Sequence, residues 1–294
     1  MVSGLEAHPA GTLLDRVLAE LAPGPQSALA LCGSVLGMPG APRAVAERLL
    51  VALLGADPRV RQLADGRWGL VPEVQGSPLL DECAFAVVDV ETTGMRAHGN
   101  DRITEIAVVL VHGTRREVVF ESLVNPGRPI PPAITQITRI SNDMVRHAPA
   151  FADIADQVVS ALGGRVFVAH NARFDWSFVT AELHRARHLD LDGVRLCTVR
   201  LARRLVRGVR SCGLDNLSQH FAFENPARHR AAGDAYVTAT LLDRLLCLAR
   251  EEGARTLQDL EAIGTRRAPP RPRKRRPPAM PSDPREDSFA EGPA

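Results

Sequence analysis

The feature that most restricts the fold is a series of three apolar segments of strand length, at residues 85–90, 103–111 and 117–124. The turn sequence Asn125-Pro126-Gly127 follows the third segment. Helical periodicity and one further buried strand then alternate at residues 154–162, 165–169, 172–187 and 231–250. Consecutive strands followed by alternating helices and strands predict an α/β domain with a mixed sheet.

Residues 12–71 carry a different pattern. Helices are expected at residues 13–21, 27–36 and 43–54, followed by strands at residues 60–64 and 67–71. The strands flank Asp65-Gly66, a dipeptide that tolerates the positive φ angles of a tight type I′ turn. Three helices and a hairpin resemble a winged helix-turn-helix module, whose third helix and hairpin often contact nucleic acid. The alternative is a small docking domain in which Trp68 packs the hairpin onto the helices.

The chain has 294 residues, about twice the usual domain length, and 45% of them are hydrophobic, so two folded units are expected. The last thirty residues hold eight basic and four acidic side chains and many prolines, which predicts a basic tail without regular structure. The expected units are a winged-helix-like domain at 1–75, a linker at 76–83, the α/β domain at 84–250, a helical extension at 251–264 and the disordered tail at 265–294.

Cysteine usage and hydropathy indicate the compartment. The five cysteines are far apart and form no C-x-x-C pair, which predicts neither a zinc site nor a disulfide framework. No apolar run approaches the ~18 residues of a membrane span. We therefore expect a cytoplasmic protein without membrane association.

The first strand of the α/β domain ends in charged residues. In the sequence FAVVDVETTG, Asp89 and Glu91 are two residues apart, so both carboxylates project from the same face of the strand. Two neighbouring acids repel each other unless a cation joins them. Carboxylate oxygens are the ligands that Mg²⁺ and Mn²⁺ prefer, so this strand end is a candidate metal site.

Two later segments carry similar chemistry. HNARFD places His170 and Asn171 after the strand at residues 165–169, and it places Asp175 in the first turn of the next helix. HRAAGDA supplies His229 and Asp234, which would lie about 140° apart on one ideal helix. His229 is therefore expected in the loop before that helix.

The three motifs DVETTG, HNARFD and HRAAGD, in this order, resemble those of the DEDDh 3′-5′ exonucleases, including the proofreading epsilon subunit of bacterial DNA polymerase III and its stand-alone relatives. The resemblance covers residues 84–250 and implies a ribonuclease H-like mixed sheet flanked by helices. All five signature positions match, as Asp89, Glu91, Asp175, His229 and Asp234.

The resemblance implies hydrolysis of phosphodiesters with two divalent metal ions, Mg²⁺ or Mn²⁺, about 3.5 to 4 Å apart. Asp89 would bridge both ions, and Glu91 and Asp234 would hold the ion that activates water. Asp175 would hold the second ion, directly or through water. His229 is the expected general base, because an imidazole with a near-neutral pKa accepts a proton at working pH and contributes about 10² to 10⁴ in rate.

The same resemblance implies a pocket for the terminal nucleotide. Thr138 and Ile140 would face that nucleotide, but Arg139 stands where the family usually has Gly, which leaves the local backbone open. The remaining expected substrate contacts are Thr92, Thr93, Gly94, His170 and Asn171.

The favoured substrate is DNA with single-stranded or frayed 3′ ends, in proofreading or repair. Whether the enzyme is bound to a replicative DNA polymerase is left open. One alternative is an RNA-trimming exonuclease of the same fold, because no motif here reads the 2′-hydroxyl. Another is a non-catalytic winged-helix protein that binds nucleic acid. The four intact acids argue against it, because a metal-free cluster of carboxylates would be destabilising.

Overall fold

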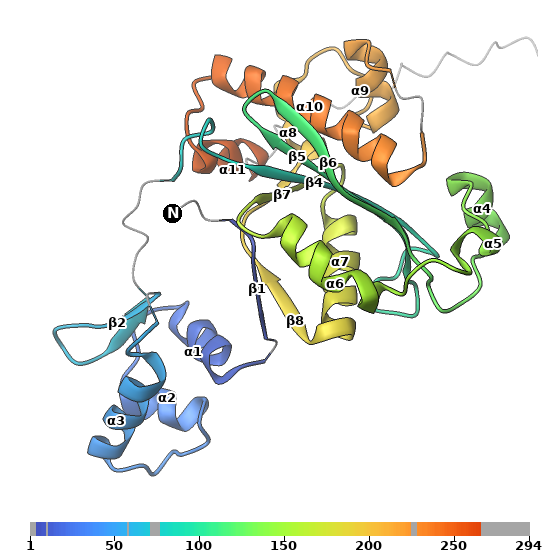
Figure 1. Ribbon diagram of the computed structural model, residues 1–294. Helices are drawn as coiled ribbons and strands as arrows, with labels where there is room; N and C mark the ends of the chain where they lie inside the picture. The colour runs from blue at the N-terminus through green and yellow to red at the C-terminus, as the bar shows by residue number, and fades with distance from the viewer. Residues whose placement is uncertain (1–3, 10, 58, 71–76, 225–227, 266–294) are drawn as a thin grey trace, which may run out of the picture.

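The computed structural model describes residues 4–9, 11–57, 59–70, 77–224 and 228–265 (Figure 1). Its largest unit is built on a five-stranded sheet of order β6-β5-β4-β7-β9. The central strand β4 pairs antiparallel with β5, which pairs antiparallel with β6, whereas β4, β7 and β9 run parallel. The strands are β4 (Phe85–Thr92), β5 (Ile103–His112), β6 (Arg115–Leu123), β7 (Val166–Ala169) and β9 (Arg195–Cys197). The predicted mixed sheet is confirmed.

Helices cover both faces of this sheet (Figure 1). Side chains alternate along β4: Ala86 and Val88 pack with one group of helices, and Phe85 and Val87 pack with the other. A fully buried Val or Phe side chain contributes about 1.5–3 kcal/mol. The first group is α6 (Phe151–Leu162) and α7 (Arg173–Arg187); the second is α8 (Thr198–Leu205), α9 (Leu214–Phe221), α10 (Ala231–Glu251) and α11 (Leu257–Thr265).

Several short elements were not expected from the sequence. The helices α4 (Pro132–Thr138) and α5 (Asn142–Val145) are seven and four residues long, too short for helical periodicity to be detected. They surround a small core of Ile130, Ile140 and Val145. The strands β8 (Leu189–Asp192) and β9 and the helix α9 were also missed.

The N-terminal unit has a hydrophobic core of its own. A capping box between Thr12 and Asp15 begins its first helix. In the hairpin, Gly66 has a φ of +81° but Asp65 is not in the positive-φ region, so the expected type I′ turn is wrong. Its elements are α1 (Leu13–Leu21), α2 (Ala28–Ser34), α3 (Arg43–Leu54), β2 (Val60–Gln62) and β3 (Trp68–Leu70).

The first described residues belong to the larger unit. The strand β1 (Glu6–Pro9) pairs antiparallel with β8, and Leu5 is 2% exposed in the core beneath α6 and α7. The N–H of Leu5 donates to the carbonyl of Arg165 at 2.8 Å. The expected N-terminal domain of residues 1–75 therefore does not account for residues 5–9, which pack with the α/β domain.

Of the segment expected as a linker at residues 76–83, the described residues 78–83 also pack on the larger unit. Leu80 and Cys83 are buried in the core beneath α10. The carbonyl of Pro78 accepts a hydrogen bond from the N–H of Leu257 at 2.9 Å, at the start of α11. Residues 71–76 and the predicted tail beyond Thr265 lie outside the described residues. Among the helices that the structure describes, none is both long and apolar enough to cross a membrane.

Because Leu5 fills the core of the larger unit, we expect Leu5→Ala to lower its free energy of unfolding by about 2–5 kcal/mol. Leu49→Ala, at an exposed leucine of α3, is the matched control and should change stability by less than about 0.5 kcal/mol. Urea unfolding of the full chain measures both values. Equal effects of the two substitutions would show that residues 4–9 do not stabilise the larger unit.

Candidate active site

The alternation along β4 continues from the core into the charged strand end. Asp89 and Glu91 follow Phe85 and Val87 on the face that α10 covers. Asp89 lies opposite Ala107 of β5, and Glu91 lies opposite Glu105. The predicted pair of carboxylates therefore shares one face at the C-terminal end of the central strand.

Asp175 reaches the same strand end from α7. Its side chain is 3% exposed, and its Oδ1 accepts a hydrogen bond from the N–H of Val90 at 3.3 Å. Asp175 lies in the first turn of α7, where the positive end of the helix dipole favours a carboxylate. The structure therefore brings the HNARFD motif against the residue between Asp89 and Glu91.

His229 and Asp234 complete the cluster from the start of α10. His229 lies in the loop before the helix, as expected, with a φ of +59° that few non-glycine residues adopt. Its N–H donates to Oδ2 of Asp234 at 3.0 Å. One ligand atom each of Glu91, His229 and Asp234 lies within 4.8 Å of the others. These three side chains can therefore approach a single ion or water.

The electrostatics of the cluster favour a bound cation. Burial raises the pKa of Asp89 well above its usual range, and the charges of Asp175 and Glu91 raise it further. Burial and the charge of Asp234 raise the pKa of Glu91 to about 7. Burial also raises the pKa of Asp175. Close carboxylates with raised pKa values are a donor set that fits a hard divalent cation, which would relieve their repulsion.

Glu105 and Arg230 belong to the site, although the sequence analysis did not single them out. Glu105 is 6% exposed, and its Oε1 and Oε2 accept hydrogen bonds from Nε of Arg230 at 3.0 and 3.1 Å. Oε2 also accepts from the N–H of Ala231, the first residue of α10, at 2.8 Å. This ion pair holds the loop of His229 against β5. An acid inside an apolar strand was the signal that could have revealed it.

The residues after Glu91 shape their own loop. The hydroxyl of Thr92 donates to the carbonyl of Gly94 at 2.6 Å. The hydroxyl of Thr93 accepts from the N–H of Arg102 at 3.0 Å. A Cβ on Gly94 would lie 2.5 Å from the carboxylate of Asp101, so any larger residue there would displace that carboxylate. Thr92 and Thr93 are buried, so their described contacts stabilise the loop.

The expected nucleotide contacts at Thr138 and Ile140 are covered in this structure. Arg139 ends α4 with a φ of +62°, the left-handed conformation that glycine would adopt without strain. Arg139 therefore adopts in this chain a conformation that is open to glycine. The hydroxyl of Thr138 accepts from the N–H of Ile140 at 3.2 Å, and Ile140 is completely buried in the small core.

His170 connects two elements in this structure. Its Nδ1 lies 2.8 Å from the hydroxyl oxygen of Thr198 at the start of α8. Burial lowers the pKa of His170 to about 4, so the ring is neutral near pH 7. The exposed Asn171 has a φ of +72° and begins the turn into α7. Asn171 is therefore the more accessible of these two predicted substrate contacts.

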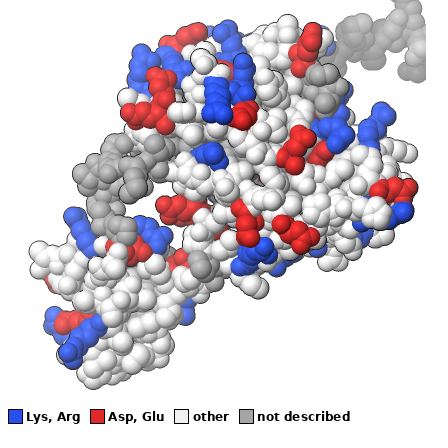
Figure 2. Space-filling model, viewed as in Figure 1, with Lys and Arg blue, Asp and Glu red and all other residues white. Residues whose placement is uncertain are grey.

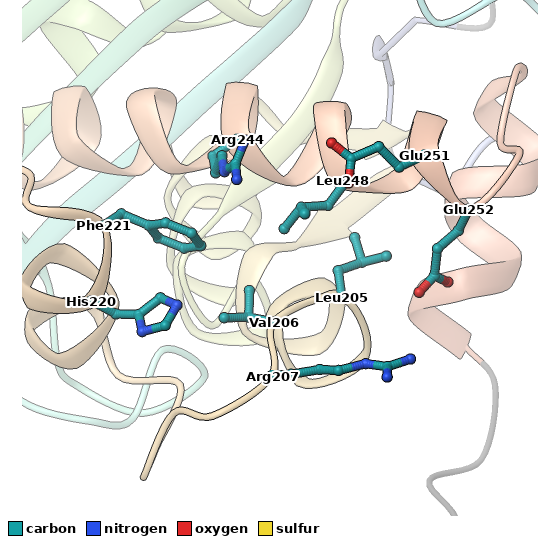
Figure 3. Close-up of a pocket in the computed structure, with 9 residues that line it drawn as sticks. All are labelled: Leu205, Val206, Arg207, His220, Phe221, Arg244, Leu248, Glu251 and Glu252. Carbon is teal, nitrogen blue, oxygen red and sulfur yellow. The ribbon is translucent and has the colours of Figure 1, made fainter.

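A separate groove lies between the end of α8, α9 and α10 (Figure 3). Its volume is about 380 Å³, and the guanidinium carbon of Arg244 lies 5.7 Å from the centre of the Phe221 ring. Glu251 and Glu252 line its other end (Figure 3). None of its lining residues is one of the predicted site residues.

Comparison with known proteins assigns the family. A family model described as an exonuclease, RNase_T, matches residues 86–242, more than half of the chain, and includes all five signature residues. The chain belongs to this exonuclease family. The solved structure of exonuclease X in complex with 5′ overhanging duplex DNA is 30% identical and covers 61% of this chain and 99% of its own, with a TM-score of 0.49.

Curated relatives of this exonuclease-family chain include longer proteins. The 3′-5′ exonuclease DinG of Bacillus subtilis is 37% identical over 179 residues, which are 61% of this chain and 19% of DinG. The DNA polymerase III subunit epsilon of Treponema pallidum is 34% identical over 168 residues, which are 56% of this chain and 78% of that subunit. The chain thus spans about a fifth of DinG but most of the epsilon subunit.

The raised pKa values predict how stability depends on pH without metal. A carboxyl whose pKa is raised by folding stabilises the protein at low pH, and this contribution is lost as the pH rises through the raised value, about 7 for Glu91. We therefore expect the Tm in EDTA to fall from about pH 5 to about pH 8. Mn²⁺ should raise the Tm most at the upper pH, because the ligands must be deprotonated. A Mn²⁺ effect that did not grow with pH would contradict this account.

Glu105 should support metal binding without being a ligand. We expect Glu105→Gln to weaken Mn²⁺ binding about tenfold, because the ion pair that holds the His229 loop is lost. Glu117→Gln, at an exposed glutamate of β6, is the control. Calorimetric titration measures the affinity, and thermal unfolding confirms that both variants are folded. Equal affinities of the two variants would exclude this supporting role.

Proposed function

We propose that this protein is a metal-dependent 3′-5′ exonuclease that removes nucleotides from the 3′ ends of DNA. The observation that carries this proposal is the convergence of Glu91, His229 and Asp234, with Asp175 against the same strand end. Three segments far apart in the sequence supply these groups, and each supplies the residue types that its motif predicts. Family membership supports the same chemistry.

Asp89, Glu91, Asp175 and Asp234 would hold two divalent ions, Mg²⁺ or Mn²⁺. When bound, such ions supply Lewis-acid activation of water and stabilisation of the leaving 3′-oxygen. His229 accepts the proton of the attacking water, because its imidazole lies beside Glu91 and Asp234. The hydrogen bond from its N–H to Asp234 and its left-handed backbone orient the ring.

The names of two relatives favour DNA over RNA as the substrate. One is named a 3′-5′ exonuclease and another a subunit of a DNA polymerase, and the latter matches over most of its length. This second similarity makes a replicative DNA polymerase the first partner to test. A non-catalytic binding module is disfavoured, because repulsion among four close carboxylates would destabilise a site that never holds metal.

The N-terminal unit is proposed to be of winged-helix type, spanning residues 12–70. Gln26, between α1 and α2, forms two backbone hydrogen bonds of 2.8 Å with Trp68, which adds a third segment to the hairpin. The visible face of this unit is largely uncharged (Figure 2). Val45 and Leu49 are exposed on α3, and Arg43 on the same helix pairs with Glu47. This surface favours the alternative that the N-terminal unit is a small docking domain over the alternative that it contacts the phosphates of nucleic acid.

The decisive assay combines two substitutions at the site. We expect Asp89→Asn to abolish hydrolysis, because it removes a charged metal ligand. His229→Ala should lower turnover about 10² to 10⁴-fold with little change in substrate affinity. Single-turnover rates with 5′-labelled single-stranded DNA, mismatched primer-template and RNA, each with Mg²⁺ or Mn²⁺, measure these effects.

His98→Ala, at an exposed histidine, is the control and should keep full activity. If Asp89→Asn retained activity within about tenfold of the wild type, the assignment of the metal site would be wrong. Preferential shortening of RNA would favour the RNA-trimming alternative.

A further inference from the structure

A recess of about 380 Å³ lies beside the loop that follows Glu91. It is lined by residues 99–100 and 126–127 and by three arginines, Arg102, Arg128 and Arg185. The arginines come from the start of β5, from the turn after β6 and from α7. Three guanidinium groups from separate elements thus converge on one recess.

Buried or rigid groups hold each of these arginines. Nε and Nη2 of Arg102 donate to the two carboxylate oxygens of Glu182, which is 1% exposed, at 2.6 and 2.8 Å. Arg128 donates from Nη1 to Asp101 at 3.3 Å and to the carbonyl of Asn100. The bidentate pair fixes the guanidinium plane of Arg102, and Arg128 is anchored through Nη1 before any ligand binds.

Arg185 is held by main-chain carbonyl groups. It donates from Nη2 to the carbonyl of Gly99 at 3.1 Å and to that of Ala97, and its Nη1 lies 3.8 Å from Glu182. Arg185 therefore lies across the loop that forms one wall of the recess. Its position fixes that wall relative to α7.

The recess has a net positive charge and N–H donors that have no hydrogen-bond partner among the described residues. Three guanidinium groups are opposed by two carboxylates, Glu182 and Asp101. Nη1 of Arg102 and both Nε and Nη2 of Arg128 form no hydrogen bond with another described residue. Planar arginine donors match the oxygens of a phosphate group. Because the side chains are already ordered, binding a phosphate costs less conformational entropy.

The recess is connected to the active-site loop. The N–H of Arg102 donates to the hydroxyl of Thr93, and that hydroxyl lies 3.4 Å from Asp101. Gly94 packs directly against Asp101. Residues of the DVETTG motif therefore contact the residues that hold Arg102 and Arg128.

We propose that this recess binds a backbone phosphate of the nucleic acid, upstream of the terminal nucleotide. The proposal rests on the proposed exonuclease function, because a strand whose 3′ end lies at the carboxylates can continue only in the 5′ direction. A phosphate held by Arg128 and its neighbours would position the strand for cleavage without taking part in the chemistry.

Arg128→Ala tests the recess, because removing Arg102 would take away the bidentate partner of the buried Glu182. We expect the KM for a long single-stranded oligonucleotide to rise about tenfold with unchanged kcat, which corresponds to one lost charge-assisted contact. The slope of log affinity against log salt should fall by about 0.7. Hydrolysis of the p-nitrophenyl ester of thymidine 5′-monophosphate, which has no upstream phosphate, should be unchanged.

Arg187→Ala is the matched control, because Arg187 lies on α7 and pairs with Asp156 outside the recess. It should leave KM and salt slope as in the wild type. An unchanged KM and salt slope in Arg128→Ala would overturn the proposal. An equal loss with the ester and the long strand would also overturn it, because the contact would then be with the terminal nucleotide.

Failure of the exonuclease function would give a different result. The wild type would then hydrolyse neither the ester nor the oligonucleotide with Mg²⁺ or Mn²⁺. In that case fluorescence anisotropy of a labelled single strand in EDTA still tests the recess. A smaller salt slope in Arg128→Ala than in Arg187→Ala would support phosphate binding, and equal slopes would exclude it.

Discussion

The ion pair between Glu105 and Arg230 holds the start of α10 against the sheet, and the geometry of the site depends on it. The residue before Arg230 is His229, and the first turn of α10 carries Asp234. A buried carboxylate that lost its partner would cost several kcal/mol, so this contact stabilises the folded domain. The position of the histidine is thus set by the pairing of Arg230, its neighbour in the HRAAGD motif, with Glu105, which lies outside the motifs.

The same strand end has to tolerate repulsion among carboxylates. Apolar side chains from both faces bury β4 up to Val88, and this packing stabilises a strand whose last residues are destabilising without a cation. Asp175 is held by a main-chain N–H and by the start of α7. Burial of apolar side chains in the core therefore offsets the repulsion among the carboxylates. A divalent cation bound between them would replace this repulsion with attraction.

Long periodic segments could be predicted because their own residues determine them. The expected helix at residues 43–54 and the expected start of β5 at Ile103 agree with the structure. Four-residue elements such as β1 and β8 could not be predicted, because each is stabilised by the other across the fold. The hairpin turn differed from the expected type because Asp65 keeps a negative φ and only Gly66 adopts a positive one.

The sequence by itself identified the residues that are proposed to carry the chemistry. The two-residue spacing of Asp89 and Glu91 requires them to share a face of any strand, since side chains alternate with a period of two. Only the tertiary structure decided that Glu105 supports His229, that Leu5 belongs to the larger core and that three arginines surround one recess. Such contacts join segments far apart in the chain, and their distances depend on how the elements pack.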